Sequence, residues 1–284
     1  MKALVSGTAG FIYSHLADYL IEQGMEVVGI DNLMTGDMEN VNPRVKFYKA
    51  DIRNLKKLQR IFKKEKPDFV FHGAANCRTM VSVDDPVLNN DINITGTLNM
   101  LIASRDHAVR KFISASSCIV YAPNTPYYVS KLAGEEYCKV FRKIYGLPTV
   151  SLRYSNVYGS LRQSEKGSHI NAIASLRKTK RETGRIWLTG DGTQTRDWSH
   201  VLDICRANYF ASRSGATGVY DICTGVQTSM NKIAKYFECP IDFVPKRPGD
   251  VKDLSKTQDP KPALKDFGYR SKIKFGADTM GVYL

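Results

Sequence analysis

Three side chains that could carry out proton transfer lie within residues 114–136, which read SASSCIVYAPNTPYYVSKLAGEE. They are the hydroxyl of Ser117, the phenol of Tyr127 and the ammonium of Lys131. Residues four positions apart share one face of a helix, so Tyr127 and Lys131 are expected to point the same way. A nearby ammonium favours the phenolate and lowers the pKa of a phenol from its usual value of about 10. Such a phenolate can take a proton from a sugar or alcohol hydroxyl while a hydride leaves the same carbon.

A glycine turn near the N-terminus could hold a dinucleotide beside these groups. The apolar residues 2–6 lead directly into GTAGFIY, and an amphipathic stretch follows. A strand, a glycine turn and a helix in this order are typical of a dinucleotide-binding turn. Gly7 would allow the tight turn, and Gly10 would let the backbone approach a pyrophosphate at the helix N-terminus. Tyr13 occupies the third glycine position, so the pattern is incomplete.

An acidic residue follows the second predicted strand. Residues 26–30 form that strand, and Asp31 comes about 20 residues after the glycine turn. A carboxylate at this position can accept hydrogen bonds from the hydroxyls of an adenosine ribose, whereas it would repel a 2′-phosphate. The sequence therefore predicts NAD rather than NADP as the cofactor.

Strand and helix patterns alternate through the first half of the chain. Further strands are predicted at residues 45–50, 69–72 and 111–114, with helical stretches between them. This alternation predicts an α/β protein with a Rossmann-like, doubly wound parallel sheet, which binds ligands at the carboxyl ends of its strands. We expect residues 1–150 to form the NAD-binding domain, which also receives a strand near residues 186–204. Residues 151–284 are expected to form a smaller α/β part that binds the substrate.

Composition narrows the class of protein. The chain has 284 residues and a formal net charge of +13, which we attribute to a solvated basic surface, with steering of anionic nucleotides as the next interpretation. We expect no nucleic-acid partner, because no recognition motif accompanies the charge. No apolar run approaches the ~20 residues that span a bilayer, so we expect no membrane segment. The six cysteines are scattered without metal-ligand spacing, which indicates no metal site and reduced thiols in the cytoplasm.

Several segments together resemble the extended short-chain dehydrogenase/reductase family, in its NAD-dependent epimerase/dehydratase branch that acts on nucleotide sugars. In chain order they read SGTAGFIYSHL, IDNL, FHGAA, NITGT, SASSCIVYA, PYYVSK, LRYSNVYG, GDGTQTRDWSHVLDI and RPGD. The resemblance covers nearly the whole chain, and the segments follow the order expected in that family. It also implies a homodimer, formed through helices near residues 92–104 and 133–145.

The resemblance assigns roles residue by residue. Tyr127 would be the catalytic acid/base, Lys131 its electrostatic partner and Ser117 the hydrogen-bond donor to the sugar oxygen. The implied cofactor-binding residues are Gly7, Gly10, Phe11, Ile12, Asp31, Asn32, Asp51, Ile52, Ala74, Ala75, Asn93, Tyr127, Lys131 and Tyr154. The implied substrate-binding residues are Ser117, Asn156, Arg196, Arg247 and Asp250.

The residues after Ser117 indicate which reaction the resemblance implies. Dehydratases of the branch carry an acid pair there, whereas this chain has Cys118 and Ile119. The 4-epimerases need no such acid, and the segment from DGT to RDWSHVLD resembles that of UDP-glucose 4-epimerase. The favoured reading is therefore C4 epimerisation of a UDP-sugar, either UDP-glucose/galactose or their N-acetyl forms, through a transient 4-keto sugar.

Two alternatives stay open from the sequence. Cys118 and His169 resemble the proton-exchange pair of relatives that combine 3,5-epimerisation of a GDP-sugar with reduction, although that chemistry ends with NADPH, which Asp31 disfavours. A catalytically impaired nucleotide-binding relative is the second alternative. It is suggested by Tyr13 and by a loop of only five residues between Tyr121 and Tyr127, where the family usually has a longer one.

Overall fold

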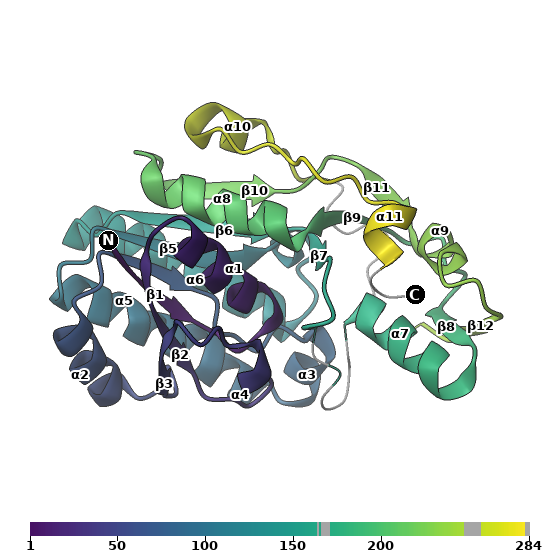
Figure 1. The fold of residues 1–284 in the computed structure, drawn as a ribbon, viewed down its shortest axis with the longest axis horizontal. Helices are drawn as coiled ribbons and strands as arrows, with labels where there is room; N and C mark the ends of the chain where they lie inside the picture. Colours follow the sequence, from purple (N-terminus) through teal and green to yellow (C-terminus); the bar gives the residue numbers. More distant parts are fainter. Residues whose placement is uncertain (164, 166–170, 247–256, 282–284) are drawn as a thin grey trace.

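A seven-stranded parallel sheet forms the centre of the computed structural model (Figure 1), which describes residues 1–163, 165, 171–246 and 257–281. All its strand pairs are parallel, as predicted for a doubly wound sheet. In spatial order its strands are β10 (Gly218–Ile222), β6 (Thr149–Tyr154), β5 (Lys111–Ser117), β4 (Phe69–His72), β1 (Lys2–Ser6), β2 (Glu26–Asp31) and β3 (Lys46–Lys49).

The central strands are apolar because helices cover both faces of the sheet. Leu4, Val5, Phe71 and Ile113 are fully buried, and such near-continuous apolar runs are typical of parallel sheets. Helices α1 (Phe11–Glu22) and α8 (Val201–Arg213) pack together on one face, and Figure 1 shows them side by side. The opposite face is covered by α2 (Leu55–Glu65), α5 (Gly96–Asp106) and α6 (Pro126–Tyr145).

The helix that carries Tyr127 and Lys131 is fixed at both ends. The Thr125 hydroxyl caps α6 by accepting a hydrogen bond from the Tyr128 amide, and Pro126 occupies the first turn. Gly146 ends the helix in the left-handed conformation, with φ of 67°. Tyr127 therefore lies in the first turn of a well-defined helix.

A smaller region packs beside the central sheet. It has its own apolar cluster, which includes Tyr158, Leu188, Trp198 and Phe237. Its strands form two small sheets, β11 (Gln227–Ser229) with β9 (Thr195–His200) and β7 (Asn156–Tyr158), and β12 (Ile241–Val244) with β8 (Ile186–Thr189). The remaining helical segments are η1 (Met38–Asn40), α3 (Thr79–Asp84), α4 (Pro86–Asn90), the π-helical η2 (Asp91–Thr95), η3 (Cys118–Tyr121), α7 (Ala172–Thr183), α9 (Met230–Lys235), α10 (Lys261–Phe267) and α11 (Ala277–Met280).

The expected strand near residues 186–204 does not join the central sheet, so that prediction was wrong. The seventh strand is β10, whereas β8 and β9 belong to the two small sheets. The burial of β8 alternates, with Ile186 and Leu188 buried but Trp187 52% exposed. Such a strand has one solvated face and does not suit a sheet that helices cover on both sides.

The strand register brings the ends of the central strands together. Ser6 at the end of β1 is the partner of His72 at the end of β4, and Ser117 at the end of β5 is the partner of Tyr154. Any ligand at this edge therefore contacts several strands at once. Within the described ranges, no helix is both long and apolar enough to cross a membrane.

Candidate active site

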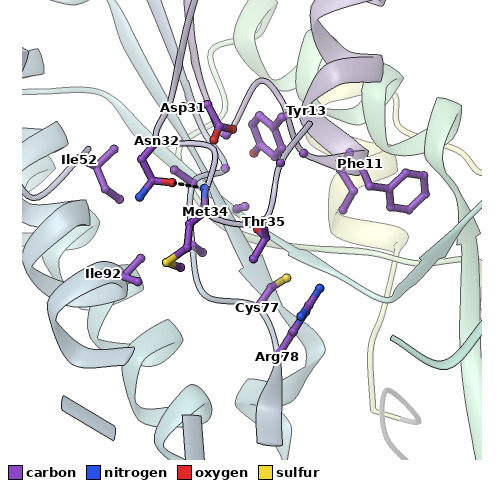
Figure 2. Close-up of a pocket in the computed structure, with 18 of the residues that line it drawn as sticks. Phe11, Tyr13, Asp31, Asn32, Met34, Thr35, Ile52, Cys77, Arg78 and Ile92 are labelled. Atoms are coloured by element: carbon purple, nitrogen blue, oxygen red, sulfur yellow. Dashed lines mark hydrogen bonds between the residues drawn. The ribbon is translucent and has the colours of Figure 1, made fainter. Parts of the chain in front are cut away.

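A cleft of about 1250 Å³, including space open to solvent, lies at the carboxyl edge of the sheet. We call it the main cleft. Figure 2 shows its wall, with Asn32 and Ile52 together on one side and Cys77 across from Tyr13. Most of the predicted cofactor residues line it, namely Gly7, Gly10, Phe11, Ile12, Asp31, Asn32, Asp51, Ile52, Ala74, Ala75, Tyr127, Lys131 and Tyr154.

The glycine turn at the base of the main cleft has the geometry that a pyrophosphate requires. Gly7 adopts φ of 81°, and a Cβ at this position would lie 2.9 Å from the amide nitrogen of Ala74. The N-cap of α1 is Gly10, which has no side chain to cap the first amides of the helix. Uncapped amides at a helix N-terminus form an anion-binding site, so the turn fits a dinucleotide phosphate.

Asp31 fastens the glycine turn to the end of β2. Its Oδ2 accepts a hydrogen bond from the Ala9 amide at 3.0 Å, and its Oδ1 accepts one from the Leu33 amide at 2.8 Å. Burial raises the pKa of the carboxyl, although both backbone donors oppose this shift. Each carboxylate oxygen has a further lone pair for a ribose hydroxyl, so Asp31 fits the predicted role while also supporting the turn.

Tyr127 and Lys131 lie together in the main cleft, as their spacing predicts. The Lys131 Nζ is 5.8 Å from the centroid of the Tyr127 ring and donates to the Ala115 carbonyl at 3.0 Å. Burial lowers the pKa of Lys131 to about 8. It also raises the pKa of Tyr127 well above its usual value, despite an opposing hydrogen bond with Ser117. The expected lowering of the phenol pKa was therefore wrong for this structure, because desolvation by burial is the largest cause of the shift.

Ser117 lies behind the main cleft at the junction of β5 and η3. Its Oγ accepts a hydrogen bond from the Ile119 amide at 3.2 Å and caps η3. Ser117 is nevertheless near enough to the Tyr127 phenol to oppose the rise of its pKa. The neighbouring Ser116, which does line the main cleft, donates at 2.5 Å to the buried carboxylate of Glu135.

Asn93 stands behind the cleft wall rather than lining it. Its Oδ1 accepts from the Asn76 amide at 2.7 Å, and its Nδ2 donates to the Asn76 carbonyl at 2.9 Å and to Ser130 at 3.0 Å. Asn93 is 3% exposed. Asn93 therefore holds the loop after β4 against α6. It would influence a bound cofactor by positioning that loop.

His72 is a buried polar link between β1, β4 and the helical layer. Its Nδ1 lies 2.8 Å from Ser6 Oγ, and its Nε2 lies 2.9 Å from Thr97 Oγ1. Because Thr97 donates its proton to the Asn93 carbonyl, it accepts from His72, which places the imidazole proton on Nε2. Burial, with a smaller contribution from Lys131, lowers the pKa of His72 to about 3.

This neutral histidine predicts a loss of stability in acid. The unfolded chain binds a proton at His72 below a pH of about 6.5, whereas the folded chain resists it down to about 3. The contribution is present above pH 6.5 and is lost as the pH falls toward 3. The unfolding midpoint, measured by circular dichroism from pH 7 to pH 5, should fall more steeply for the wild type than for His72→Gln. Equal slopes would contradict this account of His72.

Two predicted substrate residues, Asn156 and Arg196, are not among the residues that line the main cleft. Asn156 is on β7 and Arg196 on β9, two strands that pair with each other. Among the described residues, no hydrogen-bond partner reaches the buried Oδ1 of Asn156. Arg247 and Asp250, like His169 of the alternative reaction, lie outside the described residues. Cys118 is described and is only 3% exposed.

The main cleft is also lined by residues that were not among the predicted cofactor-binding or substrate-binding residues. They are Tyr13, Ile30, Met34, Thr35, Gly36, Ala50, Gly73, Cys77, Arg78, Ile92, Ala115, Ser116, Gln163 and Asn171. Many of them follow the carboxyl ends of β2 and β4, where any doubly wound sheet gathers its ligand contacts. That rule could have identified the Met34 and Cys77 loops. Within the described part of the chain, no group of three or more His, Cys, Asp or Glu residues could hold a metal ion.

Comparisons with known proteins agree with this geometry. A sequence profile of the NAD dependent epimerase/dehydratase family matches residues 3–223. The putative UDP-glucose 4-epimerase of Methanocaldococcus jannaschii is 38% identical over 256 residues, which cover 84% of this chain and 82% of that protein. The UDP-glucose 4-epimerase of Thermotoga maritima, solved with UDP-glucose, gives a TM-score of 0.93 at 33% identity and covers 100% of this chain and 97% of that chain.

A second solved structure carries the cofactor. The UDP-glucose 4-epimerase of Thermus thermophilus in complex with NAD gives a TM-score of 0.91 at 32% identity and covers 100% of this chain and 99% of that chain. The predicted fold class is thus confirmed. With the profile match over most of the sequence, these similarities show that the chain belongs to the NAD-dependent epimerase/dehydratase family.

Proposed function

We propose that this chain interconverts the C4 epimers of a UDP-sugar with NAD as its cofactor. The observation that carries the proposal is Tyr127 and Lys131 on one face of α6, with Ser117 beside the phenol, at the edge of a glycine-lined cleft. Relatives at up to 38% identity bear the name UDP-glucose 4-epimerase, and one was solved with UDP-glucose. Cys118 and Ile119 stand where the resemblance places the acid pair of a dehydratase, which favours epimerisation.

The arrangement divides the work among three side chains. When bound, NAD would accept a hydride from the sugar C4 and return it to the opposite face. Tyr127 takes the proton of the C4 hydroxyl as the carbonyl forms and gives it back when the alcohol is restored. Lys131 stabilises the phenolate and holds the ribose side of the cofactor. Ser117 donates a hydrogen bond to the sugar oxygen.

Because the pKa of Tyr127 is raised, its phenolate form needs electrostatic stabilisation. Burial keeps the phenol neutral in the structure, so a phenolate needs a second positive charge beside that of Lys131. The oxidised nicotinamide ring is cationic and would supply that charge within the same desolvated pocket. The base would then be available mainly when the cofactor is oxidised, which suits a cycle that begins with removal of a hydride.

We further propose that the nucleotide sugar spans the two parts of the chain. Residues 1–150 would hold NAD, and residues 151–284 would hold the UDP group. Asn156 and Arg196 lie on the paired strands β7 and β9, so they can reach one ligand together. Arg247 and Asp250 are proposed to complete this phosphate site. A guanidinium suits bidentate contact with a diphosphate.

The assembly state is proposed to be a homodimer in the cytoplasm. Val129, Val140 and Ile144 are 55%, 44% and 64% exposed on α6. Their spacing of eleven and four residues places them on one face of the helix. An apolar stripe of this kind is suited to pairing with a second copy, which sedimentation equilibrium tests directly. The cysteines in the described residues are free, as suits a reducing compartment.

The proposed activity is tested with a panel of nucleotide sugars. Purified protein supplied with NAD should interconvert UDP-glucose and UDP-galactose, or their N-acetyl forms, without net accumulation of NADH. Sugar products are followed by chromatography, and NADH by absorbance. Net oxidation alone or loss of water would contradict the proposal. Deuterium incorporation at C3 or C5 of a GDP-4-keto-6-deoxy sugar would favour the alternative that uses Cys118 and His169.

A further inference from the structure

The ring of Tyr13 fills space that a side chain at position 73 would need. A Cβ built on Gly73 would lie 2.2 Å from both Cδ2 and Cε2 of Tyr13, well inside van der Waals contact. Tyr13 is 4% exposed and lines the main cleft together with Gly73. Dinucleotide turns use a glycine on the helix for close packing. Here the helix carries the bulky residue, and the loop after β4 carries the glycine.

The Tyr13 hydroxyl joins a buried chain of hydrogen bonds. Its Oη lies 3.3 Å from the His72 carbonyl oxygen and 3.1 Å from the Tyr154 Oη. The Asn208 Nδ2 in turn donates to the Tyr154 Oη at 2.8 Å. One consistent set of donors therefore runs from Asn208 to Tyr154, then to Tyr13 and finally to the carbonyl of His72. The chain links α8, β6, α1 and β4 at the level of the main cleft.

Tyr154 gives this chain of hydrogen bonds a connection to the reaction centre. It is the register partner of Ser117 and lines the main cleft with Tyr127. Tyr13 lies in the first turn of α1, where the glycine turn meets the helix. The Tyr13 phenol therefore connects the phosphate-binding end of the cleft to the end that holds the proposed base.

We propose that Tyr13 is a cofactor-positioning residue. Its ring supplies the packing that a side chain at position 73 would otherwise provide, and its hydroxyl fixes the orientation of Tyr154 against the bound NAD. Removing only the hydroxyl should then weaken NAD binding, although the ring still fills its space. An activity measurement rests on the proposed function, whereas NAD affinity can be measured without any sugar. A failure of the role proposed for Tyr13 can therefore be distinguished from a failure of the proposed function.

The first test compares Tyr13→Phe with Tyr220→Phe. Tyr220 is also buried, and its hydroxyl donates to Asp266 at 2.7 Å, away from the main cleft. Both variants lose one hydroxyl, so both should unfold a few degrees earlier. NAD affinity, measured by calorimetry on protein freed of nucleotide, should fall about five- to tenfold for Tyr13→Phe. For Tyr220→Phe it should stay within about twofold.

A second pair of variants separates packing from positioning. Gly73→Ala alone should destabilise the fold, because its Cβ meets the Tyr13 ring. The double variant that carries both Tyr13→Gly and Gly73→Leu should unfold at a higher temperature than Tyr13→Gly or Gly73→Leu alone. Its NAD affinity should stay below that of the wild type, because the Tyr13 hydroxyl is gone. Recovery of wild-type affinity by the double variant would overturn the proposal, since packing alone would then suffice.

The decisive negative result is a Tyr13→Phe protein that binds NAD as the wild type does. Tyr13 would then be a space-filling residue only. If Tyr13→Phe is too unstable to purify, Tyr154→Phe breaks the same link from β6 and should weaken NAD binding to a similar degree. Unchanged binding in Tyr154→Phe would overturn the proposal equally.

Discussion

Replacing Tyr127 by phenylalanine should lower kcat for the interconversion of the UDP-sugar about 1000-fold, which is within the usual range for loss of a positioned acid/base. The substitution removes only the hydroxyl, which lies near Ser117. The ring should keep its place under Lys131. KM for the sugar and affinity for NAD should therefore change little, so that the loss is confined to the chemical step.

The control for this prediction is the adjacent Tyr128. Its side chain is half-buried on the same helix and is absent from the residues that line the main cleft. Tyr128→Phe should keep a kcat within about twofold of the wild type. A Tyr127→Phe protein that retained more than a tenth of kcat would mean that another group carries the proton, and the role proposed for Tyr127 would be wrong.

The parallel sheet could be predicted because its central strands are apolar on both faces and alternate with helices. The edge strand β10 could not be predicted on that basis, because it carries Asp221, whose two carboxylate oxygens share the proton of the Tyr121 hydroxyl. Residues 186–188 read as a better strand for the sheet, although Trp187 is exposed. An apolar segment indicates that its residues are buried, but it does not identify the strand or helix that packs against them.

In the candidate active site, a local sequence pattern predicted some features and could not predict others. Spacing predicted that Tyr127 and Lys131 would meet, because the periodicity of a helix fixes which residues share a face. The direction of the Tyr127 pKa depends on burial by the whole fold, which no local pattern contains. The fit between Tyr13 and Gly73 joins residues sixty positions apart. From the sequence alone, Tyr13 therefore indicated only that the glycine motif is incomplete.

Replacing Glu135 by glutamine should have the largest effect on stability. Glu135 is 4% exposed, lies one turn after Lys131 and accepts two hydrogen bonds from Arg153, at 2.8 and 2.6 Å, as well as one from Ser116. Removing its charge leaves the Arg153 guanidinium without its buried partner. Because Arg153 keeps some solvent contact, the expected loss is about 2–3 kcal/mol, or an unfolding midpoint about 5–10 °C lower.

The same substitution should shift the pH dependence of activity. Burial lowers the pKa of Lys131, Cys77 and Glu135 oppose this shift, and the balance leaves that pKa at about 8. Without the carboxylate, Lys131 should lose its proton at a lower pH, so the alkaline limb of kcat/KM should move downward in Glu135→Gln.

Glu136 provides the matched control for both effects. It is the next residue on α6 and pairs with Lys139 at 3.2 Å, with both side chains about 60% exposed. Glu136→Gln should therefore change stability by less than about 0.5 kcal/mol and leave the alkaline limb in place. If Glu135→Gln unfolds within a degree of the wild type, Glu135 does not join β5, α6 and β6. If its alkaline limb stays where it is, Glu135 does not raise the pKa of Lys131.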